Sequence, residues 1–113
     1  MSEKVYMLNA LWFKADGGAE KYQEYGAAAA PLVAKYGGHL VTPAFSPHTA
    51  LIGDFDPDVF FVVEYPDWES FRSLPDDPDY QAIAHLREEA IDKSVLIACR
   101  SLGDGFMAEQ HRM

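Results

Sequence analysis

Three stretches of the chain are apolar at nearly every position, which is typical of strands covered on both faces. Residues 5–13 (Val-Tyr-Met-Leu-Asn-Ala-Leu-Trp-Phe) contain a single polar residue, Asn9. Residues 59–65 (Val-Phe-Phe-Val-Val-Glu-Tyr) likewise contain only Glu64, and residues 95–100 form a third apolar run that ends in Arg100. β-branched and aromatic side chains dominate these short runs, so we predict a strand in each of them.

Between these strands, apolar residues recur at helical spacing. Over residues 19–36 they fall three and four positions apart and form one face: Tyr22, Tyr25, Ala29, Leu32, Val33 and Tyr36. Pro31 lies inside this pattern and removes a backbone hydrogen bond, so we expect a kink or break there. Gly37 and Gly38 provide the helix end.

A second helical region follows residues 59–65. Its first helix is predicted to start at Asp67, whose carboxylate can accept bonds from the backbone amides of the first turn. Residues 75–78 (Pro-Asp-Asp-Pro) break this helix, and we interpret the aspartates here as turn and cap residues. A further helical segment is predicted over residues 79–93.

The remaining segments complete a β-α-β-β-α-β order. Residues 39–45 predict a short strand, and Pro43 within it indicates an edge or a bulge. Residues 50–55 are compatible with a short returning hairpin arm. The order predicts one α+β domain over residues 1–113. This is a ferredoxin-like sandwich, a four-stranded antiparallel sheet with both helices on one face. Its tail, residues 101–113, is expected to be a short arm or disordered.

The apolar strands also predict a partner for the sheet. An antiparallel sheet with one wet face should alternate apolar and polar residues, yet residues 5–13, 59–65 and 95–100 do not. Helices on one side can cover only one of the two faces. We therefore expect a second copy of the chain to cover the other face, giving a homodimer in which two sheets pack together.

Composition and charge argue against two further classes of partner, nucleic acids and membranes. The 113 residues carry a formal net charge of −9, and the nine Lys and Arg residues are scattered, so nucleic acid is not an expected partner. The chain has neither a basic-then-apolar leader nor an apolar run long enough for a membrane helix, which predicts a cytoplasmic protein with no membrane partner. Cys99, the single cysteine, excludes an intrachain disulfide.

Several short motifs stand out along the chain: Tyr25, Pro31, Tyr36-Gly37-Gly38, Val63-Glu64-Tyr65-Pro66-Asp67, Asp77-Pro78-Asp79-Tyr80-Gln81 and Arg87. In their order and spacing they resemble the DUF1330 family of the dimeric α+β barrel superfamily. The resemblance covers about residues 6–98, which is nearly the whole chain. The resemblance implies a ferredoxin-like protomer and a face-to-face dimer, but no established reaction. Cofactor-free monooxygenases, isomerases and haem proteins share the architecture of the superfamily, so fold alone does not choose among them.

Glu64 and His39 are the candidate catalytic residues. A carboxylate on a doubly covered strand is costly unless it is paired or protonated, and Arg87 on an apolar helical stripe is the candidate partner. Three roles remain open for Glu64: an ion pair with Arg87 that fixes helix to sheet, a general base or ligand carboxylate, or a strand-end group in solvent. His39 is either an acid–base group or a partly exposed strand residue.

Four further residues are candidates for ligand binding together with Arg87: Asn9, Trp12, Tyr25 and Tyr80. Polar groups among aromatic walls suit a small organic ligand between sheet and helices, although each could equally be a core residue with one hydrogen bond. The histidine positions show no recognised zinc spacing and no phosphate-binding glycine loop is present, so we expect neither a metal nor a cofactor. A haem protein would need a histidine that faces a large pocket.

Two functional hypotheses follow. The first is a protein that binds or transforms a small organic molecule, resembling a cofactor-free oxygenase or an isomerase. The second is a non-catalytic structural or interaction module whose polar residues only support the fold. The first requires a cavity of a few hundred Å3 with Glu64 or His39 on its wall, and the second requires a Glu64–Arg87 pair and no cavity. The sequence does not decide whether the chain is an enzyme.

Overall fold

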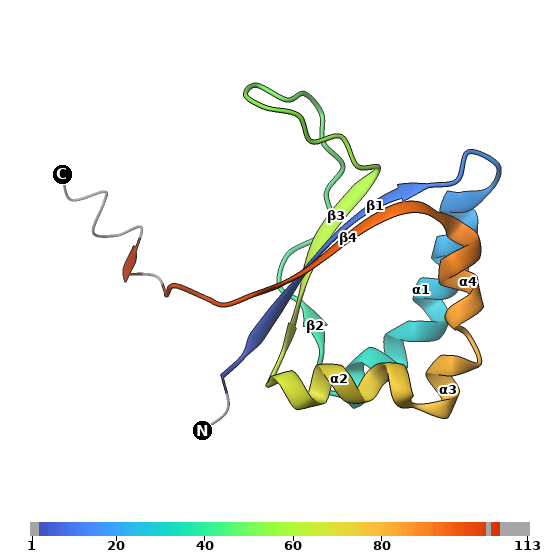
Figure 1. The fold of residues 1–113 in the computed structure, drawn as a ribbon, viewed down its shortest axis with the longest axis vertical. Helices are drawn as coiled ribbons and strands as arrows, with labels where there is room; N and C mark the ends of the chain where they lie inside the picture. The colour runs from blue at the N-terminus through green and yellow to red at the C-terminus, as the bar shows by residue number, and fades with distance from the viewer. Residues whose placement is uncertain (1–2, 104, 107–113) are drawn as a thin grey trace.

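The computed structural model describes residues 3–103, 105 and 106 and confirms the predicted order of strands and helices. The elements are β1 (Val5–Phe13), α1 (Gly18–Lys35), β2 (His39–Leu40), β3 (Val59–Tyr65), α2 (Trp68–Asp76), α3 (Pro78–Gln81), α4 (Ala84–Ala90) and β4 (Ile91–Cys99). The strands form one antiparallel sheet in the order β2-β3-β1-β4, with α1, α2, α3 and α4 on one side of it (Figure 1). Within the described residues, no helix has the length and apolarity required to cross a membrane.

The register of β1 with its two neighbours assigns every strand side chain to a face. Asn9 lies opposite Phe61 and Leu96, whereas Leu8 lies opposite Val62 and Ile97. Residues directly opposite one another share a face, so the sheet has an inner face toward the helices and an outer face away from them. The inner face carries Val5, Met7, Asn9, Leu11, Val59, Phe61, Val63, Tyr65 and Leu96. The outer face carries Tyr6, Leu8, Ala10, Trp12, Phe60, Val62, Glu64, Val95, Ile97 and Cys99.

Helix α1 runs without interruption through Pro31, so the predicted break does not occur. Core packing on both sides of the proline accounts for this. Before it, Ala29 packs in a buried cluster with Tyr25 and Leu86, and after it Val33 packs against the cluster of Val5, Met7 and Tyr65. The helix ends as expected at Gly37, whose φ of 81° lies in the left-handed region that glycine favours.

The second half of the chain departs from the predicted boundaries. Asp67 caps α2 as expected, because its carboxylate accepts a bond from the Ser70 amide at 2.7 Å. The prediction of a single helical segment over 79–93 is wrong. Two helices, α3 and α4, stand in its place, and β4 begins at Ile91 rather than at residue 95. The strand begins there because Ile91 and Lys93 pair with Phe13 and Trp12 of β1. Strand pairing overrides helical spacing here.

The second strand and its hairpin are shorter than predicted. β2 covers only His39 and Leu40, and a single bridge between Phe45 and Phe60 continues its pairing with β3. Residues 50–55 form a loop rather than a strand. Residues 101–103 extend away from the body of the molecule (Figure 1), as an arm would. The rest of the predicted tail, at 104 and 107–113, lies outside the described residues.

Asp77 joins the end of α1 to the start of α3. Its carboxylate is buried and accepts bonds from the Lys35 ammonium at 2.8 Å, the Tyr36 hydroxyl at 2.6 Å and the Asp79 amide at 2.8 Å. These bonds, led by the one from Lys35, hold the pKa of Asp77 well below its usual range. Asp77 is thus a cap residue, as predicted, and it fixes the helix turn that carries Tyr80.

We expect Asp77→Asn to lower the melting temperature by several degrees at neutral pH. Because the folded state depresses the pKa of Asp77, the stability it contributes is present above pH about 4 and is lost as the pH falls below that value. The difference in melting temperature between the wild type and the variant should therefore shrink on acidification, as followed by circular dichroism. Asp76→Asn, at an exposed neighbour, is the control. A difference that stays constant down to low pH would contradict this role.

Candidate functional site

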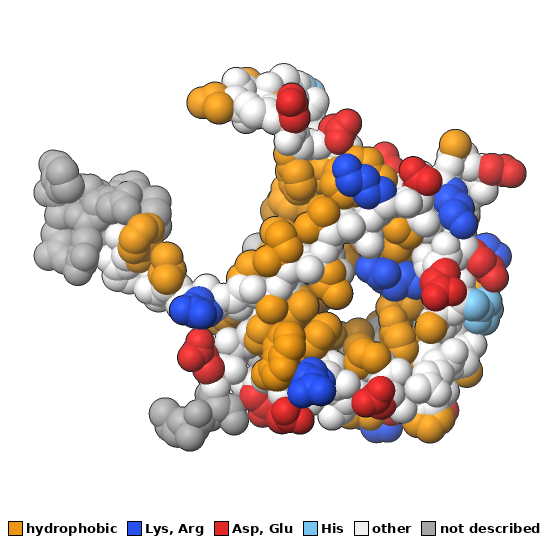
Figure 2. All heavy atoms as spheres, in the orientation of Figure 1, with side chains coloured by type: hydrophobic (Ala, Val, Ile, Leu, Met, Phe, Trp, Pro, Cys, Tyr) orange, Lys and Arg blue, Asp and Glu red, His pale blue; other side chains and the backbone are white. Residues whose placement is uncertain are grey.

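A cavity of about 500 Å3 lies between the inner face of the sheet and the helices. Figure 2 shows it as a hollow bordered mainly by hydrophobic side chains. Its walls come from all four strands of the sheet on one side and from α1, α2, α3 and α4 on the other. The cavity therefore occupies the place where the sequence predicted a ligand site.

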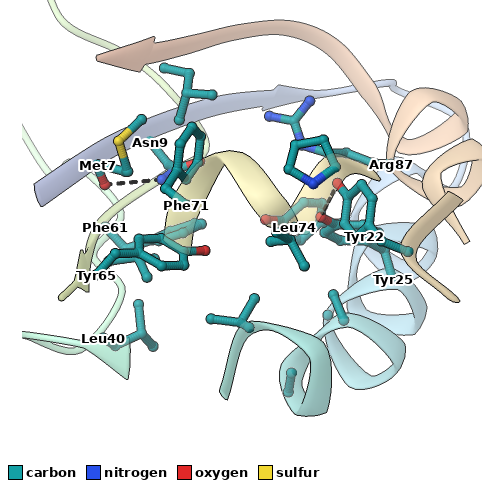
Figure 3. A pocket seen from close by; sticks show the side chains of 18 of the residues that line it. Met7, Asn9, Tyr22, Tyr25, Leu40, Phe61, Tyr65, Phe71, Leu74 and Arg87 are labelled. Atoms are coloured by element: carbon teal, nitrogen blue, oxygen red, sulfur yellow. Dashed lines mark hydrogen bonds between the residues drawn. The ribbon is translucent and has the colours of Figure 1, made fainter. Parts of the chain in front are cut away.

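One end of the cavity, formed by α1, α3 and α4, is polar. The hydroxyls of Tyr25 and Tyr80 share a hydrogen bond of 2.7 Å, and Arg87 lines the same wall. Figure 3 shows Arg87, Tyr22 and Tyr25 next to one another at this end. Burial, reinforced by the bond to Tyr80, raises the pKa of Tyr25, and burial raises the pKa of Tyr22 to about 12. Both phenols therefore stay protonated at neutral pH and are hydrogen-bond donors.

The opposite end, against β1, β3 and α2, is mostly apolar, and its polar groups are the Tyr65 hydroxyl and the Asn9 amide. Met7, Phe61, Tyr65, Phe71 and Leu40 lie there, across the gap from Arg87 (Figure 3). The Asn9 side chain also lines the cavity and donates a bond to the Met7 carbonyl at 3.1 Å. Asn9, Tyr25, Tyr80 and Arg87 were all predicted as ligand-binding residues, and the structure brings the four together around one cavity.

Gly26 is a cavity residue that the sequence analysis overlooked. It lies in the interior of α1, where glycine destabilises a helix by roughly 0.5–1 kcal/mol relative to alanine. No neighbour requires it, since a Cβ built at Gly26 meets no atom within 4 Å. Its missing side chain leaves room for the cavity. A glycine inside an otherwise good helical pattern was the available signal.

Trp12, in contrast, does not belong to this site. It lies on the outer face, where its indole N–H donates to Asp56 at 3.1 Å and Lys93 sits 4.5 Å from the ring centroid. It borders a polar depression of about 710 Å3 between the sheet and the 46–58 loop. Its placement in the pocket between sheet and helices was therefore wrong. Side chains alternate along a strand, so Trp12 and Asn9, three positions apart, point to opposite faces.

The predicted ion pair between Glu64 and Arg87 is also wrong. Glu64 lies on the outer face, whereas Arg87 reaches the cavity on the other side of the sheet. The Glu64 carboxylate instead contacts His39 Nε2 at 2.9 Å and Lys4 Nζ at 3.5 Å, and it accepts a hydrogen bond from Tyr6. The bond from Tyr6, together with the charges of Lys4 and His39, lowers the pKa of Glu64.

The structure thus brings the two candidate catalytic residues together, but outside the cavity. His39 pairs with Glu64 in the β2–β3 register, which no local sequence pattern could reveal. Neither of them lines the cavity. His85 does not line it either, and His48 borders the depression beside Trp12 instead. Across residues 3–103, 105 and 106, no group of three or more His, Cys, Asp or Glu side chains could hold a metal ion.

Comparison with known proteins identifies the family. The family model described as a domain of unknown function, DUF1330, matches residues 4–99. The chain belongs to the DUF1330 family. Among curated proteins, none matches this sequence.

Solved structures agree with the ferredoxin-like fold. The RPA0582 protein of unknown function from Rhodopseudomonas palustris is 28% identical, with a TM-score of 0.81 over 91% of this chain and 85% of that one. A methylated form of RPA0582 gives 29% identity and a TM-score of 0.83, covering 93% and 85% of the two chains. A dimeric ferredoxin-like protein of unknown function from Jannaschia sp. CCS1 is 14% identical, with a TM-score of 0.69 over 87% and 99%. These solved neighbours support the α+β fold and carry no reaction with them.

Proposed function

We propose that this DUF1330 protein binds a small organic molecule in the cavity between its sheet and its helices. The observation that carries the proposal is a cavity of about 500 Å3 that is apolar at one end and polar at the other. Small-molecule sites typically combine this size, apolar walls and a few convergent polar groups. A purely structural module would have filled this space with side chains, because protein interiors are close-packed.

Binding, rather than acid–base chemistry by the predicted pair, is the function that the geometry supports. A general base must reach the proton it abstracts, and its pKa should lie near the working pH. Glu64 and His39 lie across the sheet from the cavity. Among the described residues of the cavity wall, none is a carboxylate or an imidazole, and the phenols of Tyr22 and Tyr25 have raised pKa values.

We also propose that the protein is a homodimer that associates through the outer face of the sheet. Ile97 on this face is 49% exposed, in the same row as Leu8 and Val62. The 46–58 loop and residues 100–103 both project beyond the sheet on the side away from the helices (Figure 1). In this position they would contact a second copy. Dimers among ferredoxin-like structural neighbours support the same arrangement.

Filling the cavity from Gly26 tests the binding proposal. Gly26→Leu should place a side chain in the cavity and weaken binding of N-phenylnaphthylamine, an uncharged fluorescent probe, at least tenfold. Gly26→Ala should bind almost normally and unfold at a higher temperature, because alanine favours the helix by roughly 0.5–1 kcal/mol. Ala27→Leu, at an exposed position of α1, is the control for surface hydrophobicity. Equal probe binding by wild type and Gly26→Leu would refute the proposal.

Glu64→Gln tests whether Glu64, which contacts His39, Lys4 and Tyr6 on the outer face, contributes to binding in the cavity. Since Glu64 lies on the opposite side of the sheet, the variant should bind N-phenylnaphthylamine within about twofold of the wild type. Its far-ultraviolet circular dichroism should confirm that it is folded. A large loss of probe affinity in a folded Glu64→Gln protein would show that Glu64 does contribute to ligand binding.

A charge on the outer face tests the assembly. Ile97→Glu should convert the dimer to a monomer in size-exclusion chromatography with light scattering at micromolar concentration, because an unpaired carboxylate is costly to bury in an apolar interface. Ala27→Glu adds the same charge on α1 and should leave the dimer intact. The proposal is wrong if the wild type is itself a stable monomer at this concentration.

A further inference from the structure

We infer that the ligand of this cavity is an amphiphile with a carboxylate head, which Arg87 and the Tyr25–Tyr80 pair hold at the polar end. The inference rests on the proposed binding function and specifies the chemical class of the ligand. It follows from three features: an arginine without an acidic partner, a surplus of hydrogen-bond donors around it, and an apolar opposite end.

Arg87 differs from other basic residues of the protein in its surroundings. Lys4, Lys21, Lys35 and Arg72 each have a carboxylate in ion-pair range. Among the described residues Lys14, Lys93 and Arg100 have no such partner, but these three side chains are exposed to solvent. Arg87 has none among the described residues, although it is half-buried and faces the cavity. The described part of the lining contributes no acidic side chain either. The guanidinium is therefore the one formal charge on this wall, and it attracts an anion.

The neighbouring tyrosines add donors rather than acceptors. The two hydroxyls of Tyr25 and Tyr80 carry two protons, and their mutual bond of 2.7 Å uses one of them. The other proton is available to a ligand, because both tyrosines line the cavity. A guanidinium has five N–H donors and no acceptor. A carboxylate complements this set, because it only accepts hydrogen bonds and fits the planar fork of arginine. An ammonium group would be repelled by the positive charge of Arg87.

The other end of the cavity suits a hydrocarbon body. Met7, Phe71 and Leu40 lie across the gap from Arg87 and present only apolar side chains. A cavity of about 500 Å3 is large enough for a medium-length alkyl chain or an aromatic ring attached to the head group. The ligand class is therefore a small alkyl or aryl carboxylate rather than a sugar or a nucleotide, whose bodies need polar partners along their whole length.

A matched ligand series tests the head group. Octanoate, octanol and octylamine share one chain length and differ in charge, and each is titrated at neutral pH against N-phenylnaphthylamine bound to the wild-type protein. We expect octanoate to displace the probe at the lowest concentration and octylamine at the highest. Arg87→Gln should weaken octanoate binding about tenfold to a hundredfold, in line with the loss of charged hydrogen bonds, and change octanol binding less than about threefold.

Two further variants keep the interpretation specific. Arg87→Lys retains the charge without the planar fork and should recover part of the octanoate affinity. Arg72→Gln removes an exposed arginine of α2 that pairs with Glu69, and it should change none of the three affinities. Circular dichroism of each variant reports whether it is folded.

The outcomes distinguish a failure of the carboxylate assignment from a failure of the proposed binding function on which it rests. If none of the three ligands displaces the probe and Gly26→Leu has no effect on the probe, the binding function itself fails. If octanol displaces the probe as well as octanoate does, and Arg87→Gln lowers both affinities equally or neither, the cavity binds ligands but the carboxylate assignment is wrong. Tighter binding of octylamine than of octanoate would likewise overturn the assignment.

Discussion

The antiparallel register of β1 is the constraint on which the rest of the structure depends. β1 is paired along both edges, and its side chains alternate between the cavity and the outer face. A slip of one residue would exchange the two sets, moving Met7 and Asn9 to the outer face and Leu8 into the cavity. Because both faces are apolar, hydrophobicity alone selects the register weakly. Specific contacts, such as Glu64 with Tyr6 and His39 on the outer face, add the missing selectivity.

The broken helical region opposite the sheet determines the shape of the cavity. A continuous helix over residues 68–90 would lie straight against the strands, whereas α2, α3 and α4 change direction at Asp77 and again between α3 and α4 (Figure 1). The buried Asp77 carboxylate holds the first of these turns against the end of α1. Tyr80 and Arg87 are thereby held beside Tyr25 without filling the space in front of them. The cavity is a consequence of these turns, together with the missing side chain at Gly26.

Most of the fold was predictable from local patterns, and the errors have identifiable physical causes. β1, α1, β3 and the cap at Asp67 follow from residue types and spacing alone. The start of β4 did not, because Ile91 continues a helical spacing and only its pairing with Phe13 makes it a strand residue. Trp12 could have been placed correctly, since the period of two already separates it from Asn9. The partners of Glu64 could not, because β2 and β3 meet through a long loop whose register depends on tertiary contacts.

The separation of the two faces has a consequence for how the protein can work. The proposed association through the outer face would bury apolar side chains around Ile97 and leave the cavity walls untouched, because the sheet lies between them. Ligand binding and dimerisation are then thermodynamically independent unless a ligand shifts the sheet itself. In the cavity, the half-buried guanidinium of Arg87 has no acidic partner among the described residues, and burying an unpaired charge is costly. The proposed carboxylate ligand would offset this cost with an ion pair and would gain the apolar contacts at the same time. In the proposed site, selectivity for the head group would therefore depend on Arg87, and affinity would depend on the apolar wall.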